Sequence, residues 1–164
     1  MNNVYLGLGS NLGDRENRLG NAKELLQEKA GKILLTSSIY ETQPWKMEDA
    51  KLFLNQVILL ETFLSAFDLM NILINIEISM GRTREKKEGY ESRIIDIDIL
   101  FYNRDILHFE SLVIPHPQIA YRRFVLEPLN EIAADYIHPD LKKPVKFLLA
   151  ECIDKGTIAK YVLK

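Results

Sequence analysis

Three things are scarce in this sequence, and each scarcity excludes a class of protein. The 164 residues include one cysteine, Cys152, so no disulfide can form within the chain, which fits a reducing compartment. The formal net charge is −2, so no basic field draws the chain to nucleic acid. No uncharged apolar run is long enough to span a bilayer, and no basic segment precedes an apolar run at the N-terminus. We therefore expect a cytoplasmic protein that binds neither membrane nor nucleic acid.

The rest of the composition is ordinary for a globular protein, with 47% hydrophobic and 27% charged residues. No internal repeat or low-complexity segment is visible in the chain. A length of 164 residues suits one domain and is enough to bury a core without disulfides. We expect residues 1–164 to form a single domain.

Two aspartates stand out because they interrupt an apolar segment, residues 93–102, whose branched and aromatic residues are typical of a buried strand. Asp96 and Asp98 are two positions apart, so they project from one face with their backbones roughly 6.6 Å apart. This spacing suits one or two divalent cations, which lie about 3.5–4 Å apart in two-metal sites for displacement on phosphorus. The alternative is a solvated sheet edge where the carboxylates pair with arginines. The opposite face is expected to pack on helices and consists of Ile95, Ile97, Ile99 and Phe101.

A polar, cationic stretch leads directly into this strand. Its positive residues are Arg82, Arg84, Lys86, Lys87 and Arg93. Such a run is usually a solvated surface, but here it adjoins two carboxylates, and arginine pairs bidentately with phosphate. Carboxylates for metal beside arginines for phosphate are what phosphoryl transfer requires. We expect residues 82–93 to include a mobile loop that closes over substrate.

A glycine-rich turn follows the first predicted strand at residues 7–13. Backbone N–H groups of such a turn can bind phosphate. Its spacing fits neither the dinucleotide fingerprint nor the P-loop. The alternative is that the glycines permit a sharp turn and close packing.

Five further side chains are candidates for ligand contact. Phe53 and Asn55 share a strand face and suit a flat heterocycle, although Asn55 equally suits a strand edge. Trp45 is either a lid over a planar ligand or a packing residue. Glu77 lies off the apolar stripe of its helix and is either a ligand contact or solvated. His116 is held between two prolines, so its ring can be aimed at a phosphate or nucleotide.

Apolar periodicity predicts the order strand, helix, strand, strand, helix, strand. The predicted strands span 4–8, 33–42, 52–62 and 93–102, and the predicted helices span 14–30 and 65–81. Asp14 and Ser65 are expected to cap these helices, and Gly31 and Gly81 to end them. A C-terminal α/β extension follows: a β segment at 106–114, a helical region from 121 broken at Pro128, a helix at 145–151 and a β segment at 157–163. The order is that of a ferredoxin-like α+β sandwich with an antiparallel sheet, helices on one face and the other face free for a site.

The motifs occur together in an order that resembles the 6-hydroxymethyl-7,8-dihydropterin pyrophosphokinase family. The resemblance rests on residues 8–13, 40–42, 53–55, 76–77, 81–84, 93–100, 115–117, 122, 124–126 and 128–129. It covers nearly the whole chain up to about Ala133. It implies transfer of pyrophosphate from ATP to the pterin hydroxymethyl group, with release of AMP, in folate biosynthesis. ATP and the pterin are the expected partners of a monomeric enzyme.

The resemblance also implies a role for each matching residue. Asp96 and Asp98 would bind two Mg²⁺ ions, and Arg82 and Arg84 would belong to a catalytic loop. The triphosphate would be held by Arg93, His116 and Arg122, and the nucleoside by Glu77 and the backbone near Ile99. The pterin would stack between Phe53 and Phe124. Its amide-like edge would bind Asn55 and backbone groups near Thr42, Gln43 and Trp45.

Some positions depart from the family pattern. The family usually has an aromatic-Gly-Pro-Arg run before the aspartate strand, whereas residues 89–93 read Gly-Tyr-Glu-Ser-Arg and are one residue longer. Ile74 replaces a glutamine that contacts nucleotide, and Phe53 replaces a tyrosine without losing the ring. None of these departures affects Asp96 or Asp98.

Two other functions remain open. A ferredoxin-like module that binds RNA would present a basic face with aromatic strands, which a net charge of −2 and acidic residues on the central strand disfavour. A different two-metal nucleotidyltransferase would use another acceptor in place of the pterin.

Overall fold

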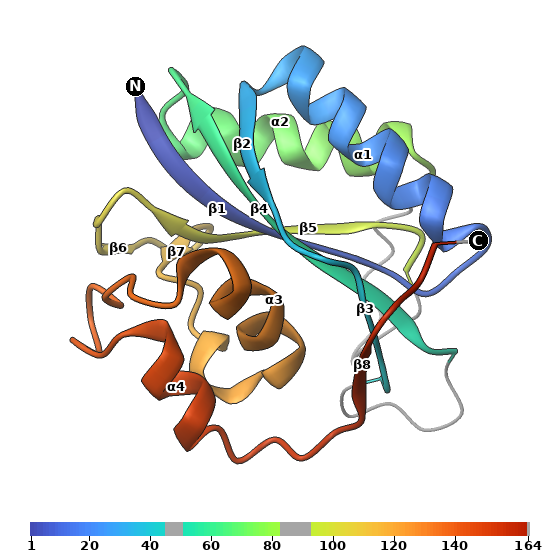
Figure 1. Ribbon diagram of the computed structural model, residues 1–164. Coiled ribbons are helices and arrows are strands. Elements are labelled where there is room, and N and C mark those ends of the chain that lie inside the picture. Colours follow the sequence, from blue (N-terminus) through green and yellow to red (C-terminus); the bar gives the residue numbers. More distant parts are fainter. Residues whose placement is uncertain (45–50, 83–92, 164) are drawn as a thin grey trace.

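An antiparallel sheet of six strands organises the part of the chain that the structure describes, residues 1–44, 51–82 and 93–163 (Figure 1). The structure is a computed structural model. The strand order is β5-β1-β4-β3-β8, and β2 pairs with the same edge of β4 as β3 does. All of these pairings are antiparallel.

The elements follow the predicted order closely. The strands of the sheet are β1 (Asn2–Ser10), β2 (Lys32–Thr36), β3 (Tyr40–Thr42), β4 (Phe53–Thr62), β5 (Asp96–Tyr102) and β8 (Ile158–Lys160). The helices are α1 (Arg15–Lys29), α2 (Ala66–Ser79), α3 (Arg123–Ala133) and α4 (Val145–Glu151), with a 3₁₀ turn at Ile119–Tyr121. In place of the β segment expected at 106–114, a small separate hairpin is formed by β6 (Leu107–His108) and β7 (Val113–Ile114).

Helices cover both faces of the sheet, and each face has its own core (Figure 1). On one face α1 and α2 bury residues such as Leu26 and Ile76 against Leu6 and Ile58. On the other face α3 and α4 bury residues such as Leu126 and Leu148 against Val57 and Phe101 of the sheet. The fold is therefore α+β, but the expectation of one wholly free face is wrong, because the C-terminal extension packs there. Within the described residues, no helix combines the length and apolarity needed to cross a membrane.

The helix boundaries lie where the capping residues predicted them. The Asp14 side chain accepts a hydrogen bond from the Asn17 N–H at 3.2 Å, and Ser65 accepts one from the Asp68 N–H at 3.1 Å. Gly31 and Gly81 have positive φ values of 155° and 100°. A Cβ at Gly31 would lie 2.2 Å from the Glu61 carbonyl oxygen, so this helix end requires glycine.

The single strand predicted over 33–42 is wrong, because it is divided into β2 and β3. Between them, Ser37 leaves the regular ladder and is 4% exposed. Its hydroxyl accepts a hydrogen bond from the Val57 N–H at 3.0 Å, and the Gln56 side chain donates to its carbonyl at 2.8 Å. A serine side chain that satisfies the neighbouring backbone makes such a break stable.

The prediction that Phe101 shares a sheet face with Ile95, Ile97 and Ile99 is wrong, because β5 contains a bulge. Tyr5 pairs with Phe101, but Leu6 pairs with Ile99, so Leu100 is an extra residue in the ladder. An extra residue reverses the alternation beyond it. Ile95, Ile97 and Ile99 pack in the α1–α2 core as expected, whereas Phe101 packs with Leu100 in the α3–α4 core.

The predicted break of the third helical region at Pro128 is wrong, because Pro128 lies inside α3. Proline there removes one backbone hydrogen bond. The buried face of the helix, which includes Leu126 and Leu129, packs on the sheet on both sides of the proline, and this burial favours continuation.

Candidate active site

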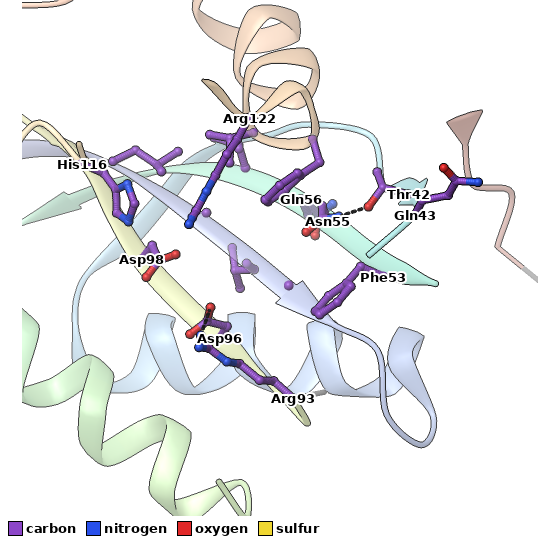
Figure 2. Close-up of a pocket in the computed structure, with 17 residues that line it drawn as sticks. Thr42, Gln43, Phe53, Asn55, Gln56, Arg93, Asp96, Asp98, His116 and Arg122 are labelled. Carbon is purple, nitrogen blue, oxygen red and sulfur yellow. Dashed lines mark hydrogen bonds and ion pairs between the residues drawn. The ribbon is translucent and has the colours of Figure 1, made fainter. Parts of the chain in front are cut away.

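Two chambers adjoin at the start of β5. The first has a volume of about 280 Å³ and lies between β1, β3, β4 and the start of α3 (Figure 2). The second has a volume of about 390 Å³ and lies between α2, β5 and the β6–β7 hairpin. Four residues line both chambers: Arg93, Asp96, Asp98 and His116. We call these four residues the junction.

The first chamber combines an aromatic ring with a fixed amide. Phe53 and Asn55 occupy the same face of β4, as predicted. The Asn55 Nδ2 donates to the Thr42 hydroxyl on β3 at 2.7 Å (Figure 2). Asn55 is 7% exposed, so its carboxamide is held in one orientation at the chamber wall.

The floor of the first chamber is glycine backbone. Gly7 and Gly9 lie inside β1 and line the chamber. A Cβ at Gly9 would lie 3.0 Å from Asn55 Oδ1 and 3.8 Å from the Phe53 ring. The absence of a Cβ at Gly9 leaves space for a flat ligand at this wall. Both glycines belong to β1 rather than to the predicted turn, so this observation supports neither interpretation of the glycine-rich segment.

Residues at the start of α3 form the opposite wall. Phe124 is the second residue of the helix and lines the chamber, and the Arg122 guanidinium carbon lies 5.7 Å from the Phe124 ring centroid. Figure 2 shows the Arg122 side chain directed from α3 toward Asp98 and His116. The α3 wall therefore offers a ring to the chamber and a cation to the junction.

Both carboxylate oxygens of Asp96 are paired with arginines. Arg82 donates to Oδ1 at 2.9 Å, and Arg93 donates to Oδ2 at 2.6 Å. The two arginines approach from opposite ends of the stretch between α2 and β5. Their charges compensate a carboxylate that is only partly exposed to water.

Glu77 is part of the same network. Its side chain is paired with Arg82, and its Oε1 accepts the Ile97 N–H at 2.8 Å. Glu77 is 3% exposed, so the solvated alternative is wrong. Burial, followed by the nearby Asp96 carboxylate, raises the pKa of Glu77.

Asp98 has the most unfavourable environment for a negative charge. Burial, followed by the Asp96 carboxylate, raises the pKa of Asp98 to about 7, although the Arg122 guanidinium opposes the shift. A largely desolvated carboxylate with a like charge beside it is easily protonated.

His116 is neutral at physiological pH. Burial, followed by the Arg122 guanidinium, lowers the pKa of His116 to about 4. Its Nδ1 accepts a hydrogen bond from the Gln118 N–H at 3.1 Å, so the ring proton is on Nε2. The Nε2–H is thus a fixed donor at the junction.

Sequence reasoning missed Asn11, whose side chain joins the backbone of Arg93 to the backbone of Lys51 beside the site. The Asn11 side chain accepts the Arg93 N–H at 2.6 Å and donates to the Lys51 carbonyl at 3.2 Å. Ser10 donates from its hydroxyl to the Ile94 carbonyl at 2.6 Å. A polar pair at the end of a buried strand is a sequence signal for such a role.

All the predicted site residues within the described ranges line one chamber or both. The first chamber contains Thr42, Gln43, Phe53, Asn55, Arg122 and Phe124, the second contains Glu77, Arg82 and Ile99, and the junction contains the other four. Trp45 and Arg84 lie outside the described residues. This placement leaves the individual roles as predictions. Ile74, which departs from the family pattern, lines the second chamber, as do Met70 and Leu73, which sequence reasoning missed.

Two adjoining chambers with carboxylates and arginines between them fit a group-transfer enzyme, and comparison with known proteins gives the family. The sequence model of the 7,8-dihydro-6-hydroxymethylpterin-pyrophosphokinase (HPPK) family matches residues 5–134. The chain belongs to this family.

Curated relatives agree with this family. The 2-amino-4-hydroxy-6-hydroxymethyldihydropteridine pyrophosphokinase of Porphyromonas gingivalis is 43% identical over 143 residues, covering 86% of this chain and 97% of the relative. The enzyme of the same name from Bacillus subtilis is 46% identical over 134 residues, covering 80% and 79%. The Pneumocystis carinii folic acid synthesis protein fol1 is 43% identical over 136 residues, covering 83% of this chain but 18% of that protein.

Solved structures show the same fold. The Plasmodium falciparum HPPK-DHPS crystal structure with STZ-DHP superposes with a TM-score of 0.74 at 20% identity. It covers 92% of this chain, which spans 43% of that longer chain.

Proposed function

We propose that this protein transfers a pyrophosphoryl group from ATP to the hydroxymethyl group of 6-hydroxymethyl-7,8-dihydropterin and releases AMP, a step of folate biosynthesis. The observation that carries the proposal is the meeting of two chambers at Asp96 and Asp98, in a chain of the HPPK family. One chamber suits a flat, hydrogen-bonding ring, and the other suits a nucleotide. The reacting groups would meet at the junction.

The pterin would occupy the first chamber, stacked between Phe53 and Phe124 above the glycine floor. Its amide-like edge would face Asn55 and the backbone near Thr42 and Gln43. The proposal is supported by the fixed Asn55 carboxamide, since a buried hydrogen-bonding group selects a ligand that satisfies it.

ATP would occupy the second chamber, with its nucleoside near Glu77 and Ile99 and its triphosphate directed to the junction. His116 would donate its Nε2–H to a phosphate oxygen, and Arg93 and Arg122 would neutralise phosphate charge. In the structure Arg82 and Arg93 both pair with Asp96. Binding of phosphate and cation would exchange these partners, leaving carboxylate on metal and guanidinium on phosphate.

Magnesium fits the donors at the junction. No group of three or more histidine, cysteine, aspartate or glutamate side chains suited to a metal ion occurs in the described residues. Mg²⁺ does not need such a group, because it usually binds one or two carboxylates together with substrate phosphates and water. We propose that Asp96 and Asp98 hold two Mg²⁺ ions with ATP. The ions would supply charge neutralisation and alignment for in-line displacement at the β-phosphorus.

We also propose that the chain is a single domain and a cytoplasmic monomer. The strand order β5-β1-β4-β3, with α1 and α2 on one face, supports a ferredoxin-like description of the sandwich. The packing of α3 and α4 on the other face of the same sheet supports one domain.

The function is tested by AMP release from ATP and Mg²⁺, with and without 6-hydroxymethyl-7,8-dihydropterin. We expect AMP to appear only when the pterin is present, without ADP. Production of ADP would mean a simple kinase. Absence of nucleotide turnover by folded protein that binds ATP would indicate a different acceptor, as in another two-metal nucleotidyltransferase.

Gly9→Ala tests whether the glycine floor receives the pterin ring. The new methyl group would lie 3.0 Å from Asn55 Oδ1 and would lift a ring away from the floor. We expect the KM for pterin to rise about tenfold, or about 1.4 kcal/mol, with the KM for ATP unchanged. Gly20→Ala on α1 is the matched control, since a Cβ there meets nothing within 4 Å. An unchanged pterin KM in Gly9→Ala would place the ring elsewhere.

A further inference from the structure

The segment that connects α4 to β8 lies beyond residues 5–134, which match the family, yet it contacts both walls of the first chamber. Asp154 is at the centre of this segment. One carboxylate oxygen, Oδ2, accepts the Arg123 backbone N–H at 3.1 Å. The other, Oδ1, accepts the Gly156 N–H at 2.9 Å, which fixes the carboxylate relative to its own backbone.

Arg123 is the first residue of α3, so Asp154 caps this helix from 31 positions away in the sequence. The residue at the N-cap position, Arg122, forms no side-chain capping bond. A carboxylate at the N-terminus of a helix satisfies an unpaired N–H and interacts favourably with the helix dipole. The Arg123 guanidinium is bound to Glu127 of the same helix, at 3.0 and 2.8 Å.

The residues after Asp154 bind the opposite wall. The Gln43 N–H donates to the Thr157 carbonyl at 3.3 Å. From there β8 pairs with β3, with Thr42 opposite Ile158. Residues 154–160 therefore connect the start of α3 with the end of β3.

The space between these walls continues from the first chamber. A cavity of about 200 Å³ lies against Asp154 and shares Thr42, Gln43 and Phe124 with the first chamber. The walls are thus not packed directly against each other at this point. Farther along α3, Glu131 joins the helix to β3 by accepting the Tyr40 hydroxyl at 2.8 Å, so the connecting segment acts on the first turn of α3 rather than on the whole helix.

We propose that Asp154 is a positioning residue that sets the width of the pterin chamber by holding the first turn of α3, with Arg122 and Phe124, in register with Thr42 and Gln43. This inference rests on the proposed function, because it assigns the width of the first chamber to pterin binding. Asp154 does not line the first chamber itself. Its effect on the reaction passes through the placement of the Phe124 ring.

The test compares Asp154→Ala with Asp154→Asn. In Asp154→Ala the Arg123 N–H loses its acceptor, and we expect the KM for pterin to rise about tenfold with the KM for ATP unchanged and kcat within about twofold. Amides in the first turn of α3 should exchange faster with deuterium. Asp154→Asn keeps one oxygen, which can accept the Arg123 N–H, and gives up the bond from the Gly156 N–H. It should restore most of both properties.

Glu127→Gln is the control, since it removes the ion pair with Arg123 on the same helix and leaves the Asp154 contact intact. It should leave the pterin KM and the first-turn exchange rates unchanged. If Asp154→Ala does not fold, Asp154→Glu replaces it, because the longer side chain displaces the carboxylate and should shift the pterin KM in the same direction.

Two results would overturn the proposal. One is a wild-type pterin KM in Asp154→Ala or its glutamate replacement, in an enzyme that releases AMP normally. The other is an equal rise in the KM for pterin and the KM for ATP, which would show a purely structural role. Failure of the wild-type protein to release pterin-dependent AMP would instead refute the proposed function, whereas the exchange measurement still reports whether Asp154 caps α3.

Discussion

Asp98→Asn is expected to abolish turnover while leaving the protein at least as stable as before. The substitution keeps the shape of the side chain but removes the negative charge that would bind Mg²⁺ at the junction. Loss of a ligand to the charge-neutralising ion should lower kcat roughly a thousandfold or more. Asp96→Ala should lower kcat to a similar extent.

The stability of the same variant should change in the opposite sense to its activity. Burial raises the pKa of Asp98 to about 7 from its ordinary value of 3.8. The folded protein therefore holds a proton at Asp98 that the unfolded chain loses, so this group's contribution to stability declines as pH rises from about 4 to about 7. Asparagine has no such decline. Without Mg²⁺, we therefore compare the free energy of unfolding of Asp98→Asn with that of wild type at two pH values. The difference in favour of the variant should be larger at pH 8 than at pH 5, by about 1–2 kcal/mol after allowance for partial solvation.

Urea unfolding at pH 5 and pH 8, together with AMP release at saturating substrates, checks both parts. Asp105→Asn is the control, because Asp105 follows the far end of β5 and is exposed. Near-normal Mg²⁺-dependent turnover in Asp98→Asn would refute the metal assignment. A variant that is inactive because it is unfolded would refute the expected stability.

Much of the site was predictable because its residues alternate along strands. The two-residue period placed Asp96 with Asp98, and Phe53 with Asn55, on common faces. It failed only beyond the bulge at Leu100, where Phe101 turns to the other core. A bulge depends on how neighbouring strands pair, which a single strand's pattern does not contain.

The division into two chambers was not predictable from spacing. It depends on α3, which covers part of the face expected to be free, and on the residues that hold α3 there. Asp154 acts on α3 through a backbone group 31 positions away, so no local pattern marks it. The same is true of Ser37, which divides β2 from β3 through the Val57 N–H of β4. The contact of Glu77 with β5 was not predictable for the same reason. Its side chain accepts the N–H of Ile97, which lies in another element, between the two aspartates.

Asn55→Ala is expected to raise the dissociation constant for pterin about a hundredfold, or about 2.7 kcal/mol, with ATP binding unchanged. Asn55 is 7% exposed, and its Nδ2 is already used by Thr42, so its Oδ1 is presented in a fixed direction. A pterin N–H that loses this acceptor remains desolvated without a partner. The Phe53 and Phe124 rings would remain to stack, so binding should weaken without vanishing.

Calorimetric titration of pterin in the presence of a non-hydrolysable ATP analogue measures this effect directly. Asn21→Ala is the matched control, because Asn21 is exposed on α1, which packs on the other face of the sheet. The loss should be specific to the ring, since Asn55 does not line the second chamber, where ATP is proposed to bind. Unchanged pterin affinity in Asn55→Ala would show that the amide serves only to join β4 to β3. Equal losses of pterin and ATP affinity would instead mean that the two chambers are a single unit, whose shape depends on the Asn55–Thr42 bond.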